Sequence, residues 1–279
     1  MNRFLPFTSL ALLAISMRAI ANDGAMHDGS RGPEPLEKTE SPVRMVSEHI
    51  EVEFGAKNST VHCTFRFRNT QTEASVTQLL GFPDEGAAIK SAYQHGWPLA
   101  DPTLSPILRM RTAVNHRPAK SKLHVVEVAP GEEGGHFAFW DAHHQHGVSA
   151  WYTLEVKFPV GRDVIVERFY TVENGWTMPG VKYFHYTTET GGAWKGTIGR
   201  LQADVKLRDG LTVNKLVWPG TMVRDSRFEE KDRETTQPKR SEWQVRNSRH
   251  LRLVWKDFEP RTEPAHRGFT VSRQASVAK

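Results

Sequence analysis

The sequence VHCTFRFR, residues 61–68, alternates apolar and polar side chains at every position. Successive side chains of a β-strand point to opposite faces of a sheet, so this alternation indicates one buried face and one solvent-exposed face. The buried face is expected to hold Val61, Cys63, Phe65 and Phe67, and the exposed face His62, Thr64, Arg66 and Arg68. The stretch therefore predicts a half-buried strand, whose apolar side needs a second layer of structure to cover it.

Short runs of the same kind recur along the chain, separated by turns rich in Gly, Pro, Asn and Asp. The expected strands are residues 49–54, 61–68, 76–82, 107–114, 123–128, 151–158, 164–172, 181–188, 201–207, 213–218, 243–246 and 251–258. Residues 151–158 and 164–172 are expected to form a hairpin, because a turn of about five residues joins them. No window has the pattern of an amphipathic helix. The series predicts an all-β fold of two β-sandwich domains, residues 45–174 and 175–260, since the strands are too numerous for one sandwich.

Residues 1–21 have the pattern of a signal peptide. Arg3 supplies a positive start, an apolar run follows over residues 4–16, and Ala19-Ile20-Ala21 fits the small-x-small cleavage pattern. The apolar run is shorter than the roughly 20 residues that a membrane-spanning helix needs. We therefore expect a mature chain that begins at Asn22 and is periplasmic or secreted.

The segments that flank the expected domains carry no sustained strand pattern. Residues 22–44 are rich in Gly, Pro, Ser and acidic residues, and they are expected to form a flexible lead-in. Residues 261–279 hold prolines and scattered arginines, and they are expected to form a disordered tail.

Composition excludes several classes of protein. The mean hydropathy is −0.53 and no second long apolar run follows residue 21, so the mature chain should have no integral membrane segment. The formal charge of +5 is small and not clustered along one element, which argues against nucleic-acid binding. The single cysteine, Cys63, cannot form a disulfide within the chain, and its place in the alternating stretch predicts a buried thiol.

The densest set of metal-ligand side chains is GGHFAFWDAHHQHG, residues 134–147. Imidazole and carboxylate groups are the usual ligands of zinc and related metals. Alternate residues of a strand point the same way, so Asp141 with His143, and His144 with His146, could converge as two pairs. Because the spacing matches no zinc signature, a His-rich surface loop remains the alternative to a metal site.

The sequence contains eight tryptophans, most of which are expected to fill the core. Trp194 lies between Gly191-Gly192 and Gly196, a setting that favours a tight turn and an exposed indole. An exposed indole can stack on a sugar ring. Trp194 is therefore a candidate ligand-binding residue, and core packing is its alternative role.

The sequence holds no Gly-x-Ser-x-Gly elbow, no phosphate-binding loop and no dinucleotide fingerprint after a strand. It therefore predicts no enzyme and no cofactor. The expected function is a non-catalytic binding or structural protein of the bacterial envelope or extracellular space, with a protein or glycan partner. The alternatives are a metal-binding protein or metal-dependent hydrolase built on residues 136–146, and a carbohydrate-binding module.

Two resemblances support these expectations. Residues 59–87 resemble the opening of the domain found in vault proteins and inter-alpha-trypsin inhibitor heavy chains, through Phe67-Arg68-Asn69, Glu73 and Phe82-Pro83, with Asp84 where that family has leucine. Residues 45–260 resemble a family of secreted bacterial two-domain β-proteins of unknown function. The marks of that family are Trp151, Phe158-Pro159, Tyr186, the segment 190–199 and the segment 255–260. The resemblance implies a fold and an exported location, and it transfers no site.

Overall fold

A computed structural model of the protein describes residues 20–21, 23–29, 32–36, 41–84, 107–128, 139–140, 147–177, 180–218, 238–260, 262–263 and 266–274. These residues are almost entirely β-structure, and their longest helical segment is a five-residue 3₁₀ helix. No helix in this part of the chain is long and apolar enough to cross a membrane. The all-β prediction is confirmed.

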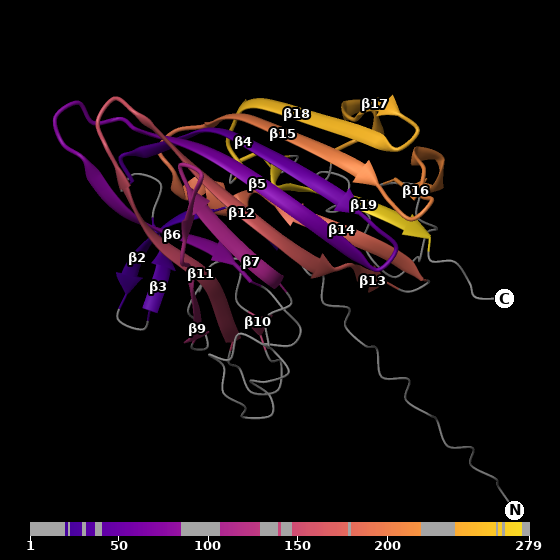
Figure 1. Ribbon diagram of the computed structural model, residues 1–279, viewed down its shortest axis with the longest axis horizontal. Coiled ribbons are helices and arrows are strands. Elements are labelled where there is room, and N and C mark those ends of the chain that lie inside the picture. Colours follow the sequence, from indigo (N-terminus) through magenta and orange to yellow (C-terminus); the bar gives the residue numbers. More distant parts are fainter. Residues whose placement is uncertain are drawn as a thin grey trace, which may run out of the picture.

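The elements follow one another as shown in Figure 1. The strands are β1 (Ile20–Ala21), β2 (Gly24–Gly29), β3 (Gly32–Pro35), β4 (Val43–Phe54), β5 (Asn58–Asn69), β6 (Val76–Pro83), β7 (Ile107–Val114), β8 (Arg117–Ala119), β9 (Lys122–Val128), β10 (Phe139–Trp140), β11 (Gly147–Phe158), β12 (Asp163–Glu173), β13 (Gly175–Thr177), β14 (Val181–Thr187), β15 (Ile198–Leu207), β16 (Leu216–Val217), β17 (Gln244–Asn247), β18 (His250–Phe258) and β19 (Gly268–Gln274). The 3₁₀ helices are η2 (Glu189–Ala193), η3 (Val213–Lys215) and η4 (Arg240–Glu242).

The largest sheet has eight strands, in the order β17-β18-β15-β4-β5-β12-β7-β8. Its central strand β5 is the stretch whose alternation predicts a half-buried strand, and its odd-numbered residues from Val61 to Phe67 are buried. β5 pairs antiparallel with β4 on one side and with β12 on the other. β4 also pairs with β15 in parallel, the arrangement that brings distant parts of the chain into one sheet.

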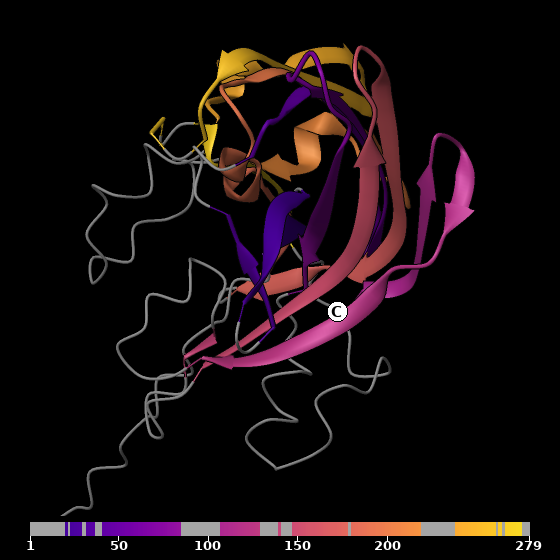
Figure 2. The ribbon, with the colours of Figure 1, turned by 90° about the vertical axis from the view of Figure 1, so that its left-hand side faces the viewer.

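Two smaller sheets cover the apolar side of this large sheet. The six-stranded sheet has the order β10-β11-β6-β2-β3 with β9 on the far edge of β11, and the five-stranded sheet has the order β1-β14-β19-β16 with β13 beside β14. One buried cluster joins all three, since it includes Phe67 from β5, Phe158 from β11 and Phe269 from β19. Figure 2 shows the strands curving around this common interior.

The expected division into a domain over residues 45–174 and a second over residues 175–260 is not what the described residues show. β15 lies in the same sheet as β4, with Glu48 beside Leu201 and Phe54 beside Leu207. The buried cluster also continues across residue 174 without a break. Strand alternation says which side chains are covered, but it does not say whether one core or two covers them.

The expected hairpin of residues 151–158 and 164–172 is also wrong. β11 pairs with β6 and β9, whereas β12 pairs with β5 and β7 in the large sheet. The turn between them therefore carries the chain from one layer to the other. Asn69 holds this corner, because its Nδ2 donates to the carbonyl oxygen of Phe158 at 3.1 Å, and Gly161 supplies the positive φ of 68°.

Both expected flexible ends contain ordered strands. Within the expected lead-in 22–44, Asp23 is fully buried and β2 pairs with β6. Within the expected tail 261–279, β19 pairs with β14 along seven residues and places Phe269 in the core. The signal peptide stays a prediction, since residues 1–19 lie outside the described residues.

Candidate functional site

The outer face of the eight-stranded sheet carries the polar members of its alternating strands. In β5, His62 and Thr64 are partly exposed and Arg66 and Arg68 are exposed, while the residues between them are buried. Strand register places the matching residues of neighbouring strands beside them. Polar side chains that are far apart in the sequence therefore become neighbours on this face.

A line of imidazole and carboxylate groups crosses this outer face; we call it the histidine–carboxylate row. It consists of His49 and Glu51 from β4, His62 from β5, Glu167 from β12, Asp204 from β15, His250 from β18, and His116 from the turn between β7 and β8. Each imidazole in the row lies within 3.5 Å of a carboxylate oxygen.

Asp204 is the centre of one half of the row. Its Oδ2 lies 3.0 Å from Nε2 of His49, and its Oδ1 lies 2.7 Å from Nε2 of His250. Nε of Arg252 and Nε2 of Gln202 also donate to this carboxylate, at 2.8 and 2.7 Å. Burial alone would raise the pKa of Asp204, but these hydrogen bonds outweigh it and hold that pKa well below its usual value.

His62 is the centre of the other half. Its Nδ1 lies 3.3 Å from Glu51, and its Nε2 lies 3.5 Å from Glu167, whose second oxygen is 3.0 Å from Nδ1 of His116. The ring of His62 stacks on Phe169 with 4.0 Å between the centroids. Hydrogen-bond partners already surround these groups. No set of three or more His, Cys, Asp or Glu side chains in the described residues could hold a metal ion.

A hollow of about 310 Å³ lies where the row reaches the end of the sheet; we call it the end hollow. Its lining comes from the end of β15 and from the turn between β17 and β18, and consists of Lys206, Leu207, Arg208, Asp209, Asn247, Arg249 and His250. Ligand pockets commonly have volumes of roughly 300–1,000 Å³, so the end hollow is large enough for a small molecule. Four of its seven lining residues are Lys, Arg or His.

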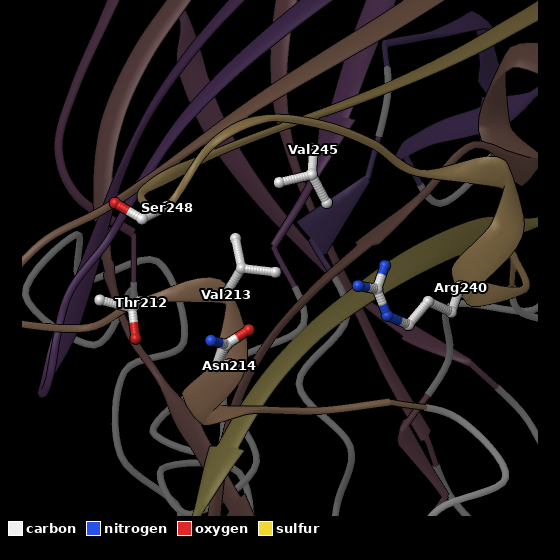
Figure 3. A pocket seen from close by; sticks show the side chains of 6 residues that line it. All are labelled: Thr212, Val213, Asn214, Arg240, Val245 and Ser248. Carbon is white, nitrogen blue, oxygen red and sulfur yellow. The ribbon is translucent and has the colours of Figure 1, made fainter.

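A second and smaller hollow, of about 140 Å³, includes Ser248 of the same turn in its lining. Figure 3 shows Val213 and Val245 pointing into it from opposite sides, with Arg240 reaching toward them from η4. The guanidinium of Arg240 lies 4.7 Å from the ring centroid of Trp218, so this cation already has an aromatic partner. The volume of this second hollow is below the range of usual ligand pockets, and we assign the hollow no ligand.

The inner face of the large sheet contains a polar group that solvent does not reach. Arg168 is fully buried and forms two hydrogen bonds with Asp23, of 3.0 Å from Nε and 2.8 Å from Nη2. Its Nη1 donates to Thr112 at 2.8 Å and to Ser121 at 3.2 Å. Other protein groups therefore supply hydrogen-bond partners for both charges, as the burial of an ion pair requires.

Next to this pair lies a second buried group around Glu48. Tyr186 donates its hydroxyl to Oε1 of Glu48 at 2.7 Å, and burial raises the pKa of this carboxyl to about 8. The Sγ of Cys63 lies 3.8 Å from the Tyr186 hydroxyl, and burial raises the pKa of this thiol above its usual value. The prediction of a buried Cys63 is confirmed. These groups are buried and contact one another, and they are not accessible to a ligand.

The residues singled out in the sequence have different outcomes. The metal candidates Asp141, His143, His144 and His146 lie outside the described residues, so that site stays a prediction. The expectation that Trp194 is exposed is wrong. Its side chain is 1% exposed, its Nε1 donates to the carbonyl oxygen of Asp23 at 2.8 Å, and its ring packs 4.6 Å from that of Phe67. It offers no face on which a sugar could stack.

Sequence reasoning missed both the row and the end hollow. The outward positions of His62 and Glu51 follow from strand alternation, but their neighbours come from strands that are distant in the chain. The polar turn 247–250 is the local feature of the sequence that could have pointed to the end hollow. The other residues of the row and of the end hollow are brought together by strand register, which the sequence does not reveal.

Among solved structures, the chain is similar to a "putative nutrient binding protein" from Legionella pneumophila, with a TM-score of 0.60 and 14% identity over 91% of this chain and 70% of that one. At this identity the likeness shows a shared fold. An M1 zinc metallopeptidase from Deinococcus radiodurans matches with a TM-score of only 0.34 and 8% identity, over 84% of this chain and 43% of that one, and so low a score establishes nothing. No protein-family model and no curated protein matches the sequence.

Proposed function

We propose that this protein is an exported, non-catalytic binding protein that takes a small anionic ligand in the end hollow. The observation that carries the proposal is the guanidinium of Arg249, which lines the end hollow and has no hydrogen-bond or ion-pair partner among the described residues. The shared fold with a protein described as nutrient-binding supports a binding role. The predicted signal peptide supports export from the cytoplasm.

The other charged groups of the end hollow are held by neighbours. Lys206 lies 3.8 Å from Glu51, Arg208 pairs with Glu53, and Asp209 accepts a hydrogen bond from the backbone of Ala56 at 2.7 Å. These pairings keep the walls in place and leave Arg249 as the cation that a ligand can engage. An arginine binds carboxylate or phosphate through two parallel hydrogen bonds, which gives both affinity and orientation.

The backbone around Arg249 is fixed before any ligand arrives. Its amide donates to Oδ1 of Asn247 at 2.8 Å, and its carbonyl oxygen accepts from the amide of Leu207 at 2.8 Å. A fixed backbone lowers the entropy cost of binding, because only the side chain has to become ordered. The end hollow is therefore partly preorganised for an anion.

The test is isothermal titration calorimetry with inorganic phosphate, citrate and glutamate as probes, on the wild type and on two variants. Arg249→Gln removes the free cation. Arg246→Gln removes another exposed cation, from β17, that does not line the end hollow. We expect at least one probe to bind the wild type and Arg246→Gln equally, and to bind Arg249→Gln at least about tenfold more weakly, which corresponds to about 1.4 kcal/mol.

Equal weakening in both variants would show attraction to net charge and would contradict a site at the end hollow. Absence of binding by all three probes to the wild type would contradict the small-anion ligand. Export is tested separately, by sequencing the N-terminus of the protein recovered from the periplasm or the medium. A first residue at Asn22 supports export, and an intact Met1 in the cytoplasm contradicts it.

A further inference from the structure

The opposite end of the same outer face carries a line of cations; we call it the basic row. It consists of Arg44 from β4, Arg66 and Arg68 from β5, Arg200 from β15 and Lys256 from β18. It lies where β4 and β15 begin and where β5 and β18 end, and β4, β15 and their neighbours can be followed along the sheet in Figure 1. None of its members lines the end hollow.

Strand register aligns these five side chains. Arg200 is directly opposite Lys256, and Arg44 is directly opposite Arg68. The two pairs are joined because Nε of Arg44 donates to the carbonyl oxygen of Thr197, just before β15, at 3.2 Å. Adjacent strands of a sheet are about 4.8 Å apart, so the basic row spans about 14 Å from β18 to β5.

The basic row has an excess of positive charge. Asp163 is shared by Arg66 and Arg68, and Asp257 pairs with Arg44 at 3.4 Å. Five cations therefore face two paired carboxylates, which leaves three positive charges. Within the described residues, Arg200 donates only to the neutral amide oxygen of Gln202, and Lys256 has no partner.

The surroundings of the basic row restrict the kind of anion. Val245 is the only large hydrophobic side chain classed as exposed in the described part of the chain, and it lies at the other end of β18. A membrane-binding face would need exposed apolar side chains to enter the lipid, and single-stranded nucleic acid would need exposed aromatic side chains to stack on its bases. The aromatic Phe169 lies opposite His62 in the histidine–carboxylate row and is already stacked on that imidazole.

We propose that the basic row is the docking surface for a strand of an acidic polysaccharide, laid across β18, β15, β4 and β5. A polymer with an anionic group on each repeating unit matches a line of cations set one strand apart. Such contacts are made in water, so each contributes little and the binding depends on several acting together. The affinity should fall steeply as salt rises, because mobile ions screen exposed charges.

The test measures binding to immobilised dextran sulfate and polygalacturonate, with neutral dextran as the negative control, at about 0.05 M and about 0.3 M salt. The variant Arg200→Ser/Lys256→Ser removes two exposed cations that pair with no carboxylate among the described residues. The matched control Arg117→Ser/Arg246→Ser removes the same charge from the two edge strands.

We expect the wild type to bind one or both acidic polymers in dilute salt and to ignore neutral dextran. The basic-row variant should bind roughly tenfold more weakly, and the control should stay within about twofold of the wild type. Equal losses in the two variants would overturn the proposal, since net charge would then explain the binding. Tighter binding to single-stranded DNA or to anionic vesicles than to both polysaccharides would also overturn it.

The proposal does not depend on the end hollow. Dextran sulfate binding that survives Arg249→Gln supports the basic row even where small anions fail to bind. Loss of polymer binding in Arg249→Gln, with no loss in Arg200→Ser/Lys256→Ser, would move the polymer site to the end hollow and would contradict the basic row.

Discussion

The two faces of the eight-stranded sheet use the same kinds of residue in opposite ways. Glu48 and His49 are neighbours in β4, and Glu167 and Arg168 are neighbours in β12. Glu48 and Arg168 are buried on the inner face, whereas His49 is partly exposed and Glu167, at 9% exposure, lies on the outer face. The buried members contact groups from the smaller sheets or from the N-terminal segment. The outer members contact one another across strands. Position relative to the second layer, rather than residue type, decides what each charge does.

The difference has an energetic consequence. An ion pair in solvent gains little, because water solvates the separated charges almost as well. A buried pair is different, since removing one partner leaves the other charge without water or a counterion. Variants of the inner face should therefore change the free energy of unfolding much more than variants of the outer face.

Arg168→Met gives the largest expected effect. The substitution leaves the carboxylate of Asp23 fully buried and without its guanidinium partner. We expect the free energy of unfolding to fall by about 3–5 kcal/mol, measured by urea denaturation at pH 7. This is a large part of the total of about 5–15 kcal/mol that is usual for a folded domain.

The double variant Asp23→Leu/Arg168→Met is the control, because it removes both charges and leaves apolar side chains in their place. It should recover most of the lost stability. A loss below about 1 kcal/mol in Arg168→Met would contradict the buried position of the pair. A double variant as unstable as the single one would show that packing, rather than the unpaired charge, causes the loss.

Glu48→Gln should give a smaller effect that depends on pH. The pKa of Glu48 is raised by burial from 4.5 to about 8, so the folded state keeps its proton while the unfolded state loses it. This contribution to stability is complete below pH 4.5 and is lost as the pH rises through 8. The glutamine keeps an oxygen that can accept the Tyr186 hydroxyl, and it does not titrate.

The measurement is the free energy of unfolding of both proteins between pH 4.5 and pH 8.5. The wild type should lose stability relative to Glu48→Gln by at most about 1.4 kcal/mol per pH unit, reaching about 3 kcal/mol at pH 7. A difference that is constant across this range would show that Glu48 ionises in the folded state as it does in water.

The sequence was a good guide to the faces of individual strands. The alternation in residues 61–68 predicted which side chains of β5 are buried, and Cys63 is buried as expected. It did not predict strand partners. The turn 159–162 has the composition of a hairpin loop, but it joins strands of two different layers, since both layers offer an apolar face to β11 and β12.

The candidate site was less predictable than the fold. The exposed position of His62 follows from its strand, yet the histidine–carboxylate row needs Asp204 and His250, which are more than 140 residues away. Trp194, which its glycine-rich surroundings marked as exposed, is buried instead. Its indole donates to a backbone carbonyl and packs against aromatic neighbours in the interior. A glycine-rich turn shows that the backbone bends, and it does not show on which side the aromatic ring lies.

Asp204→Asn should give the smallest of the three effects, because the carboxylate lies on the outer face even though its side chain is only 5% exposed. The asparagine keeps one oxygen acceptor, so some of the contacts with Arg252, Gln202 and the two histidines persist. We expect a loss of about 1.5 kcal/mol at pH 7, the lower end of the range for a hydrogen bond to a charged group, because part of the contacts persists. Since the pKa of Asp204 is depressed in the folded state, its contribution is present above the usual value of 3.8 and is lost as the pH falls below it.

Urea denaturation of the two proteins from pH 7 down to pH 2 measures this contribution as the gap between their unfolding free energies, which should narrow below pH 4. The matched control is Asp257→Asn, which changes an exposed carboxylate on the same face whose single partner in the described part of the chain is Arg44. Asn tolerates the positive φ of 46° at this position, so the control should lose less than about 0.5 kcal/mol. If Asp204→Asn loses no more stability than Asp257→Asn, the four donors around the Asp204 carboxylate add nothing to the free energy of unfolding on an open sheet face. The contrast between the two faces is then complete, with every strong electrostatic contribution on the inner one.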